Sequence, residues 1–141
     1  MTGLRVAIVH DRFIELAGSE RVVEQLYAIW PHATVHSTIV NPRAVPPGLR
    51  HADIQTTALQ RLYRGGRSYS HLLPLLPAAA AHIDVGDAEL VITSHHSFAN
   101  RVHAPSGVPI VSYTHTPARW IWDPELLRLE AEGRLGRMAL T

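Results

Sequence analysis

Val6-Ala7-Ile8-Val9-His10-Asp11 (residues 6–11) is the stretch that decides the fold of this chain. Its four consecutive apolar residues are typical of a strand buried on both faces, as the strands of parallel sheets are. Residues 20–30 follow after a short connection, and their apolar positions recur at helical spacing until Pro31 ends the pattern. A buried strand that leads into a helix predicts the first half of a βαβ unit.

The same alternation continues along the chain. Further strands are predicted at residues 33–40, 53–57, 90–93 and 109–112, the last two short and buried, and helical segments at residues 59–63 and 69–83. Gly65-Gly66 separates the two helical segments, and Pro74 and Pro77 kink or end the second. This pattern predicts an α/β fold, a Rossmann-like and mostly parallel sheet with helices on both faces, in one domain that covers residues 1–141.

The last part of the sequence starts a helix without ending it. Asp123-Pro124-Glu125 combines an N-cap aspartate with a proline at the first helical position, whereas residues 137–141 contain no stop signal. We therefore expect a truncated domain.

Composition excludes several classes of protein. With 46% apolar and 18% charged residues the chain is globular, and without cysteine it has neither disulfides nor a thiolate nucleophile. The longest apolar stretch, residues 72–81, is interrupted by two prolines, and residues 1–5 lack the apolar core of a signal peptide. A formal net charge of +1 does not suggest nucleic-acid binding, although all thirteen basic residues are arginine. We expect a soluble, cytoplasmic protein.

Polar residues gather where the predicted strands end. His10 and Asp11 follow the first strand, Ser94 and His95 follow the strand at residues 90–93, and His115 follows the strand at residues 109–112. Ligands of open α/β sheets bind outside the carboxyl ends of the strands, so we expect the site there.

The connection before the first predicted helix is a candidate phosphate site. Ala17, Gly18 and Ser19 lie at the helix start, where backbone N–H groups and the positive end of the helix can hold a phosphate. The alternative is that Gly18 and Ser19 only cap the helix. No G-x-G-x-x-G or Walker sequence is present, which disfavours a dinucleotide or P-loop site.

Two other chemistries are disfavoured. His10, Asp11, His95, His96 and His115 could converge on zinc or manganese, but no pair has the i, i+4 spacing of a metal-binding helix, and we expect hydrogen-bonding histidines and no metal. A serine hydrolase is disfavoured because the chain has no G-x-S-x-G sequence.

Aromatic and basic residues leave two further alternatives open. Arg119 and Trp120 could hold a sugar or an anion on a loop after His115, or the indole could pack beneath the last helix. Four basic residues beside leucines could touch an anionic membrane or a lipid-linked acceptor, or could form a solvated face over the core, which we favour; they are Arg61, Arg64, Arg67 and His71.

Together these residues resemble the N-terminal half of family-4 glycosyltransferases, the retaining, nucleotide-sugar-dependent enzymes of GT-B fold. The resemblance runs through residues 5–11, 18–22 and 90–95, and its most specific part is His115-Thr116-Pro117-Ala118-Arg119-Trp120-Ile121-Trp122-Asp123. That block is similar to the H-T-P-x-R-aromatic-x-W-D sequence of the mannosyltransferase-like branch. Ala17 stands where the family normally has the first of two glycines.

The resemblance implies a role for each part of the site. His115 would be catalytic, near the transferred sugar, and the loop of Ala17, Gly18 and Ser19 would face the donor diphosphate. Six residues would shape the acceptor pocket, namely His10, Asp11, Ser94, His95, Arg119 and Trp120. The partners would be a nucleotide-sugar donor and a sugar, lipid-linked or small-molecule acceptor, with no metal or other cofactor.

The resemblance also places the nucleotide-binding domain, with its pair of carboxylates, outside this chain. The chain would then be the acceptor-side domain of a hexosyltransferase of polysaccharide, glycolipid or glycoconjugate biosynthesis, inactive alone. It would be cytoplasmic, with peripheral contact to the inner face of the membrane as a further option. The alternative is a non-catalytic module that binds a glycan or a partner chain. The donor sugar and the acceptor stay open.

Overall fold

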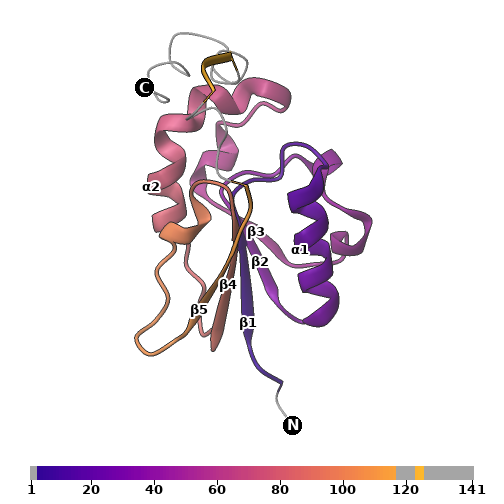
Figure 1. The fold of residues 1–141 in the computed structure, drawn as a ribbon, viewed down its shortest axis with the longest axis vertical. Coiled ribbons are helices and arrows are strands. Elements are labelled where there is room, and N and C mark those ends of the chain that lie inside the picture. The colour runs from indigo at the N-terminus through magenta and orange to yellow at the C-terminus, as the bar shows by residue number, and fades with distance from the viewer. Residues whose placement is uncertain (1–2, 117–122, 126–141) are drawn as a thin grey trace.

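A five-stranded parallel sheet forms the centre of the computed structural model, which describes residues 3–116 and 123–125 (Figure 1). The strands are β1 (Val6–His10), β2 (Thr34–Ser37), β3 (Ile54–Thr56), β4 (Leu90–His95) and β5 (Ile110–Thr114). Their order in the sheet is β3-β2-β1-β4-β5, and each neighbouring pair is parallel. β1 therefore lies in the middle. The chain adds β2 and β3 on one side of β1 and then crosses back to add β4 and β5 on the other side.

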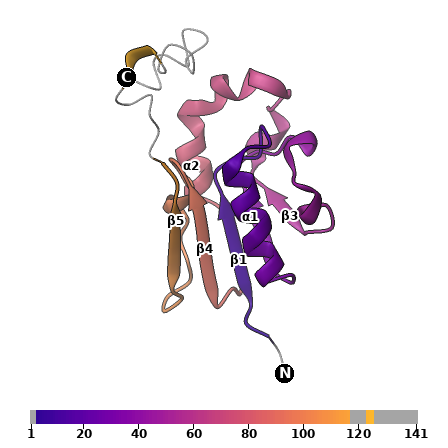
Figure 2. The same cartoon turned by 45° about the vertical axis from the view of Figure 1, so that its right-hand side comes forward.

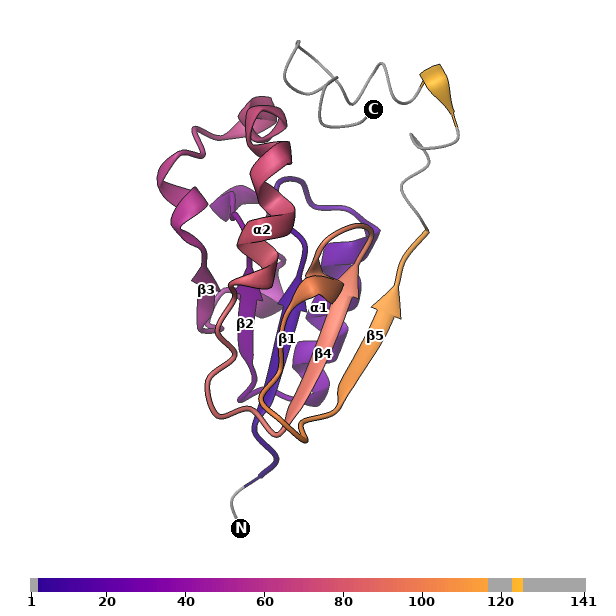
Figure 3. The same ribbon diagram turned by 90° about the vertical axis from the view of Figure 1, so that its left-hand side faces the viewer.

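Helices cover both faces of this sheet. α1 (Gly18–Ile29) packs on one face and α2 (Leu76–Ala81) on the other, as two turned views show (Figures 2 and 3). 3₁₀ helices occupy much of the connections, at Pro42–Ala44, Pro47–Leu49, Ala58–Arg61, Gly66–Leu75 and Ala99–Arg101. The predicted α/β, Rossmann-like architecture is confirmed.

The apolar run of β1 is explained by its central position. Val6 and Ile8 pack in the same cluster as Val23 of α1, whereas Ala7 and Val9 belong to a cluster on the opposite face. All five residues of β1 are buried. Alternate side chains of a strand point to opposite faces, so a strand covered on both sides has to be apolar throughout.

The leucines that follow the basic residues at positions 61–71 belong to a third core cluster. Leu72, Leu73 and Leu76 are buried and pack with Ile39. The exposed residues of this segment include Arg61, Arg64 and His71. This arrangement is that of a solvated face over a core, the reading favoured from the sequence. None of the helices in the described part of the chain is long and apolar enough to cross a bilayer.

Helix geometry departs from the prediction in the middle of the chain. The helical segment expected at residues 69–83, with a kink or an end at its two prolines, is a 3₁₀ helix, Gly66–Leu75, followed by α2. Pro74 and Pro77 each lack the N–H group that an α-helical hydrogen bond needs, which accounts for the change of geometry. The predicted helix at residues 59–63 is likewise a 3₁₀ helix, Ala58–Arg61, and the predicted strand at residues 33–40 shortens to β2.

The prediction that the last strand is buried is wrong. All five residues of β5 are exposed, and Ile110, Val111 and Tyr113 are each about half accessible to solvent. The physical reason is the position of β5 at the edge of the sheet, where β4 is its one neighbour among the described strands. The apolar run therefore predicts the strand correctly, but it does not show whether other parts of the protein cover the strand.

Candidate functional site

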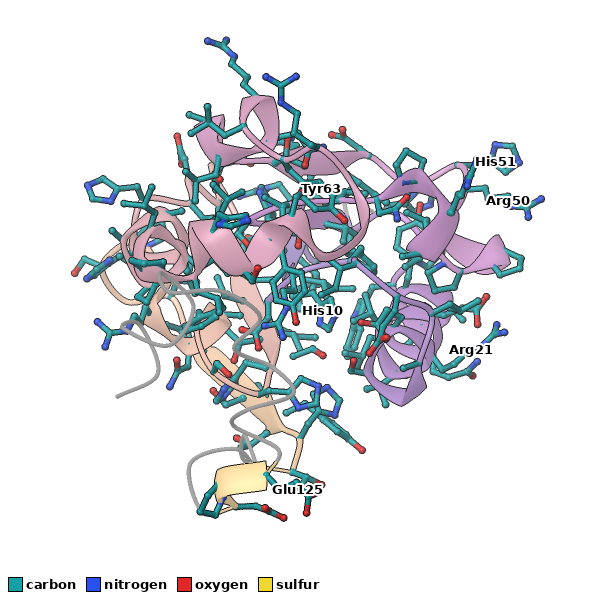
Figure 4. The ribbon with its side chains drawn as sticks, turned by 90° about the horizontal axis from the view of Figure 1, so that it is seen from above. His10, Arg21, Arg50, His51, Tyr63 and Glu125 are labelled. Carbon is teal, nitrogen blue, oxygen red and sulfur yellow. The ribbon has the colours of Figure 1, made fainter. Side chains whose placement is uncertain are left out.

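A cleft of about 410 Å³ opens at the carboxyl edge of the sheet, where β1 and β4 end side by side. Its walls come from the β1–α1 connection, from the first turn of α1, from His96 after β4 and from His115 and Thr116 after β5. Figure 4 looks down on this edge, with His10 near the centre of the view. This is the position at which open α/β sheets bind ligands, because the connections on either side of it diverge.

The first turn of α1 forms one wall of the cleft. Ala17 is the N-cap, and within the described part of the chain the backbone N–H groups of Gly18 and Ser19 have no hydrogen-bond partner. The Ala17 N–H donates to Glu20 Oε2 at 3.0 Å. This is one of the two hydrogen bonds of a capping box; the second is missing because alanine has no side-chain oxygen to accept the N–H of Glu20. Two free donors at the positive end of a helix can bind an anion.

A buried hydrogen-bonded pair lies beneath this turn. His10 is 1% exposed and Glu20 4% exposed, and Glu20 Oε1 lies 3.1 Å from His10 Nε2. Burial raises the pKa of Glu20, but the hydrogen bond and electrostatic effect of His10, together with the backbone N–H groups of Glu20 and Ala17, bring the pKa below its ordinary value. His10 Nδ1 lies 3.0 Å from the backbone carbonyl of Ser94 and 3.1 Å from its hydroxyl, which ties β1 to β4.

His115 forms the opposite wall. Its Nε2 lies 2.8 Å from Ser94 Oγ, and its backbone N–H donates to the carbonyl of His95, which continues the pairing of β5 with β4. The ring lies beside those of His96 and Tyr113, at centroid distances of 4.8 and 5.0 Å. Partial burial, and then the neighbouring imidazoles of His96 and His10, hold the pKa of His115 below its ordinary value, against the opposing effect of nearby carboxylates.

Asp11 holds the loop that follows β4. Its carboxylate accepts backbone N–H groups from His96 and Ser97 at one oxygen and from Phe98 and Ala99 at the other, at 2.6–2.9 Å. Burial raises the pKa of Asp11, yet the bonds from Ala99, His96 and Phe98 bring it below its ordinary value. Both oxygens are thus occupied within the protein, and Asp11 acts on the cleft through the position of this loop.

The other predicted site residues are distributed unevenly. Ala17, Gly18 and Ser19 line the cleft with His10, Asp11 and His115, while Ser94 is fully buried behind His115. His95 is buried, with Nε2 3.3 Å from the Thr114 hydroxyl, and its Nδ1 has no hydrogen-bond partner among the described residues. The predictions for Arg119 and Trp120 lie outside the described residues.

Sequence reasoning assigned no role to two residues at the cleft. Glu20 carries the buried pair with His10, and its signal was the glutamate at the third position of a helix start. Arg12 lines the cleft and stacks its guanidinium 5.1 Å from the ring centre of Tyr69. No signal in the sequence pointed to that stacking.

The histidines do not gather as metal ligands in the part of the structure that is described. Among residues 3–116 and 123–125, no group of three or more His, Asp or Glu side chains could hold a metal ion. His10 and Asp11 both use their side-chain atoms in hydrogen bonds within the protein. Hydrogen bonding is therefore what these side chains do in this structure.

Comparison of the chain with protein-family models, curated proteins and solved structures found no match.

Proposed function

We propose that this chain is the acceptor-side domain of a retaining glycosyltransferase of GT-B fold, which moves a sugar from a nucleotide-sugar to a hydroxyl group of an acceptor. One observation carries the proposal. The two free amides of the α1 start and the side chain of His115 line the same cleft, although they are almost 100 residues apart in sequence. An anion-binding helix start beside a neutral imidazole suits a donor diphosphate next to the sugar that is transferred.

In this proposal the cleft contributes electrostatic stabilisation and positioning. The N–H groups of Gly18 and Ser19 would stabilise the nucleoside diphosphate as its bond to the sugar breaks, because the start of α1 carries partial positive charge. His115 would contact the sugar while the acceptor hydroxyl takes the place of the diphosphate with retention at the anomeric carbon. A second domain would supply the nucleotide site and its carboxylates.

The exposed β5 supports the presence of such a further part. Ile110 and Val111 are 44% and 54% exposed, and the outer edge of β5 is unpaired among the described strands. Unpaired edges and exposed apolar side chains are normally covered in native proteins. The alternative, a non-catalytic module that binds a glycan or a partner chain, is also compatible with this surface, because either a domain or a partner would cover it.

Two substitutions of Gly18 test the diphosphate site. Proline at the first helical position removes one N–H donor and is tolerated there, and the extended backbone of Ala17 suits a residue before proline. Alanine keeps the donor, and a methyl group at Gly18 meets no atom within 4 Å. Nuclear magnetic resonance titration with inorganic diphosphate should shift the amides of Gly18 and Ser19 in the unmodified chain.

We expect Gly18→Pro to weaken diphosphate binding about tenfold or more, since a hydrogen bond to a charged group contributes about 1.5–3 kcal/mol. Gly18→Ala should bind within about a factor of two of the unmodified chain, because its N–H remains. If diphosphate leaves the amides of Gly18 and Ser19 unshifted, or if both variants bind equally, the diphosphate site is not at the start of α1. Glycan binding without any diphosphate response would favour the non-catalytic alternative.

A further inference from the structure

Four side chains beside the cleft form one hydrogen-bonded chain that ends at His115. Glu20 contacts His10 at 3.1 Å, His10 contacts the Ser94 hydroxyl at 3.1 Å, and that hydroxyl contacts His115 Nε2 at 2.8 Å. Glu20, His10 and Ser94 are each at most 4% exposed. The proposed function uses the last member, His115, and gives the three buried members no role.

The hydrogens along this chain can be assigned from its donors and acceptors. The backbone carbonyl of Ser94 can only accept, so His10 Nδ1, 3.0 Å away, carries a hydrogen. The same N–H also points to the Ser94 hydroxyl oxygen, which therefore accepts on that side. At the other end of the ring, one hydrogen lies between His10 Nε2 and Glu20 Oε1, which are 3.1 Å apart.

The direction of the last hydrogen bond follows. Ser94 is fully buried, and a buried hydroxyl hydrogen without an acceptor is costly. His10 offers no lone pair to it, because Nδ1 already carries a hydrogen. His115 Nε2, at 2.8 Å, is then the acceptor, and the hydrogen of a neutral His115 ring is at Nδ1.

We propose that Glu20, His10 and Ser94 are positioning residues that hold His115 as its Nδ1–H tautomer, so that the ring donates a hydrogen bond into the cleft. Nε2 is turned toward Ser94, which leaves Nδ1 as the nitrogen available to a ligand. His115 would then hold a hydroxyl or phosphate oxygen and would not remove a proton from it. The tautomer rests on the hydrogen bonds alone, whereas the nature of the ligand rests on the proposed function.

Ring-nitrogen chemical shifts of the 141-residue chain test the tautomer without any ligand. At pH 7 we expect Nε2 of His115 to have the shift of an unprotonated nitrogen and Nδ1 that of a protonated one. Ser94→Ala removes the donor to Nε2, and the two shifts should move toward each other as the tautomers mix. The fold should survive, because His10 Nδ1 still has the backbone carbonyl of residue 94 as its acceptor.

Ser112→Ala is the matched control. Ser112 lies on β5 and shares its hydroxyl hydrogen bond with Thr93 at 2.9 Å, so its loss should leave the His115 shifts unchanged. A protonated Nε2 in the unmodified chain, or equal shifts in Ser94→Ala and the unmodified chain, would overturn the proposal. If the tautomer is as expected and inorganic diphosphate does not bind, the positioning role stands and the glycosyltransferase proposal fails.

Discussion

Replacing Asp11 by asparagine should destabilise the whole domain, because it removes two of the four hydrogen bonds that the buried carboxylate accepts. Asp11 is 1% exposed, and its carboxylate accepts four backbone N–H groups from residues 96–99. Asparagine keeps one oxygen and places an NH₂ group against two of these donors. Two hydrogen bonds to a charged group are lost, at about 1.5–3 kcal/mol each, so we expect a decrease of about 3–6 kcal/mol in the free energy of unfolding.

Urea unfolding followed by circular dichroism at pH 7 measures this loss. Small domains have about 5–15 kcal/mol of stability in total, so the upper end of the range would leave the chain unfolded without urea. Asp87→Asn is the control, since Asp87 is 88% exposed and makes a surface ion pair with Arg5, which contributes little. The reasoning is refuted if Asp11→Asn and Asp87→Asn shift the midpoint by the same small amount.

Two further predictions concern pH and packing. The pKa values of His115 and His36 are lowered, both chiefly by burial, so the unfolded chain binds more protons than the folded one below about pH 6.5. Stability should therefore fall as the pH drops below that value. A magnetic resonance titration of His115 should have its midpoint below pH 6.5, and a His115 midpoint at or above 6.5 would contradict the prediction. Leu76→Ala, at a fully buried position, should cost about 2–5 kcal/mol, whereas Leu75→Ala, 48% exposed, should cost much less, and equal losses in urea unfolding would contradict the packing.

The sheet could be predicted from the sequence because its central strands are apolar throughout. The run at residues 6–9 can be buried only between two layers, and that requirement fixes a strand covered by helices on both faces. The exposure of β5 could not be predicted, because an edge strand and a central strand share the same apolar composition. The 3₁₀ geometry of Gly66–Leu75 was also hidden, since its prolines signal a break in the α-helix without specifying what replaces it.

The position of the cleft could be predicted from the sequence, but the hydrogen bonds between its residues could not. Parallel strands end at one edge, so His10 and His115 were expected near each other, and the structure places both at one cleft. Glu20 was overlooked because a glutamate early in a helix usually serves the helix start in solvent. Its burial against His10 depends on how α1 sits over β1, which the spacing of residues along the chain does not encode.

The central position of β1 links the cleft to the folding of the entire domain. β1 lies near the start of the sequence, whereas its neighbour β4 begins at residue 90. The contact between His10 and Ser94 therefore joins residues that are 84 positions apart. Such distant pairings form late and slowly, since a long loop has to close before they gain anything. A ribosome therefore has to release the chain through β5 before the two walls of the cleft can face each other, and a protein that has lost its β1–β4 pairing has also lost its site.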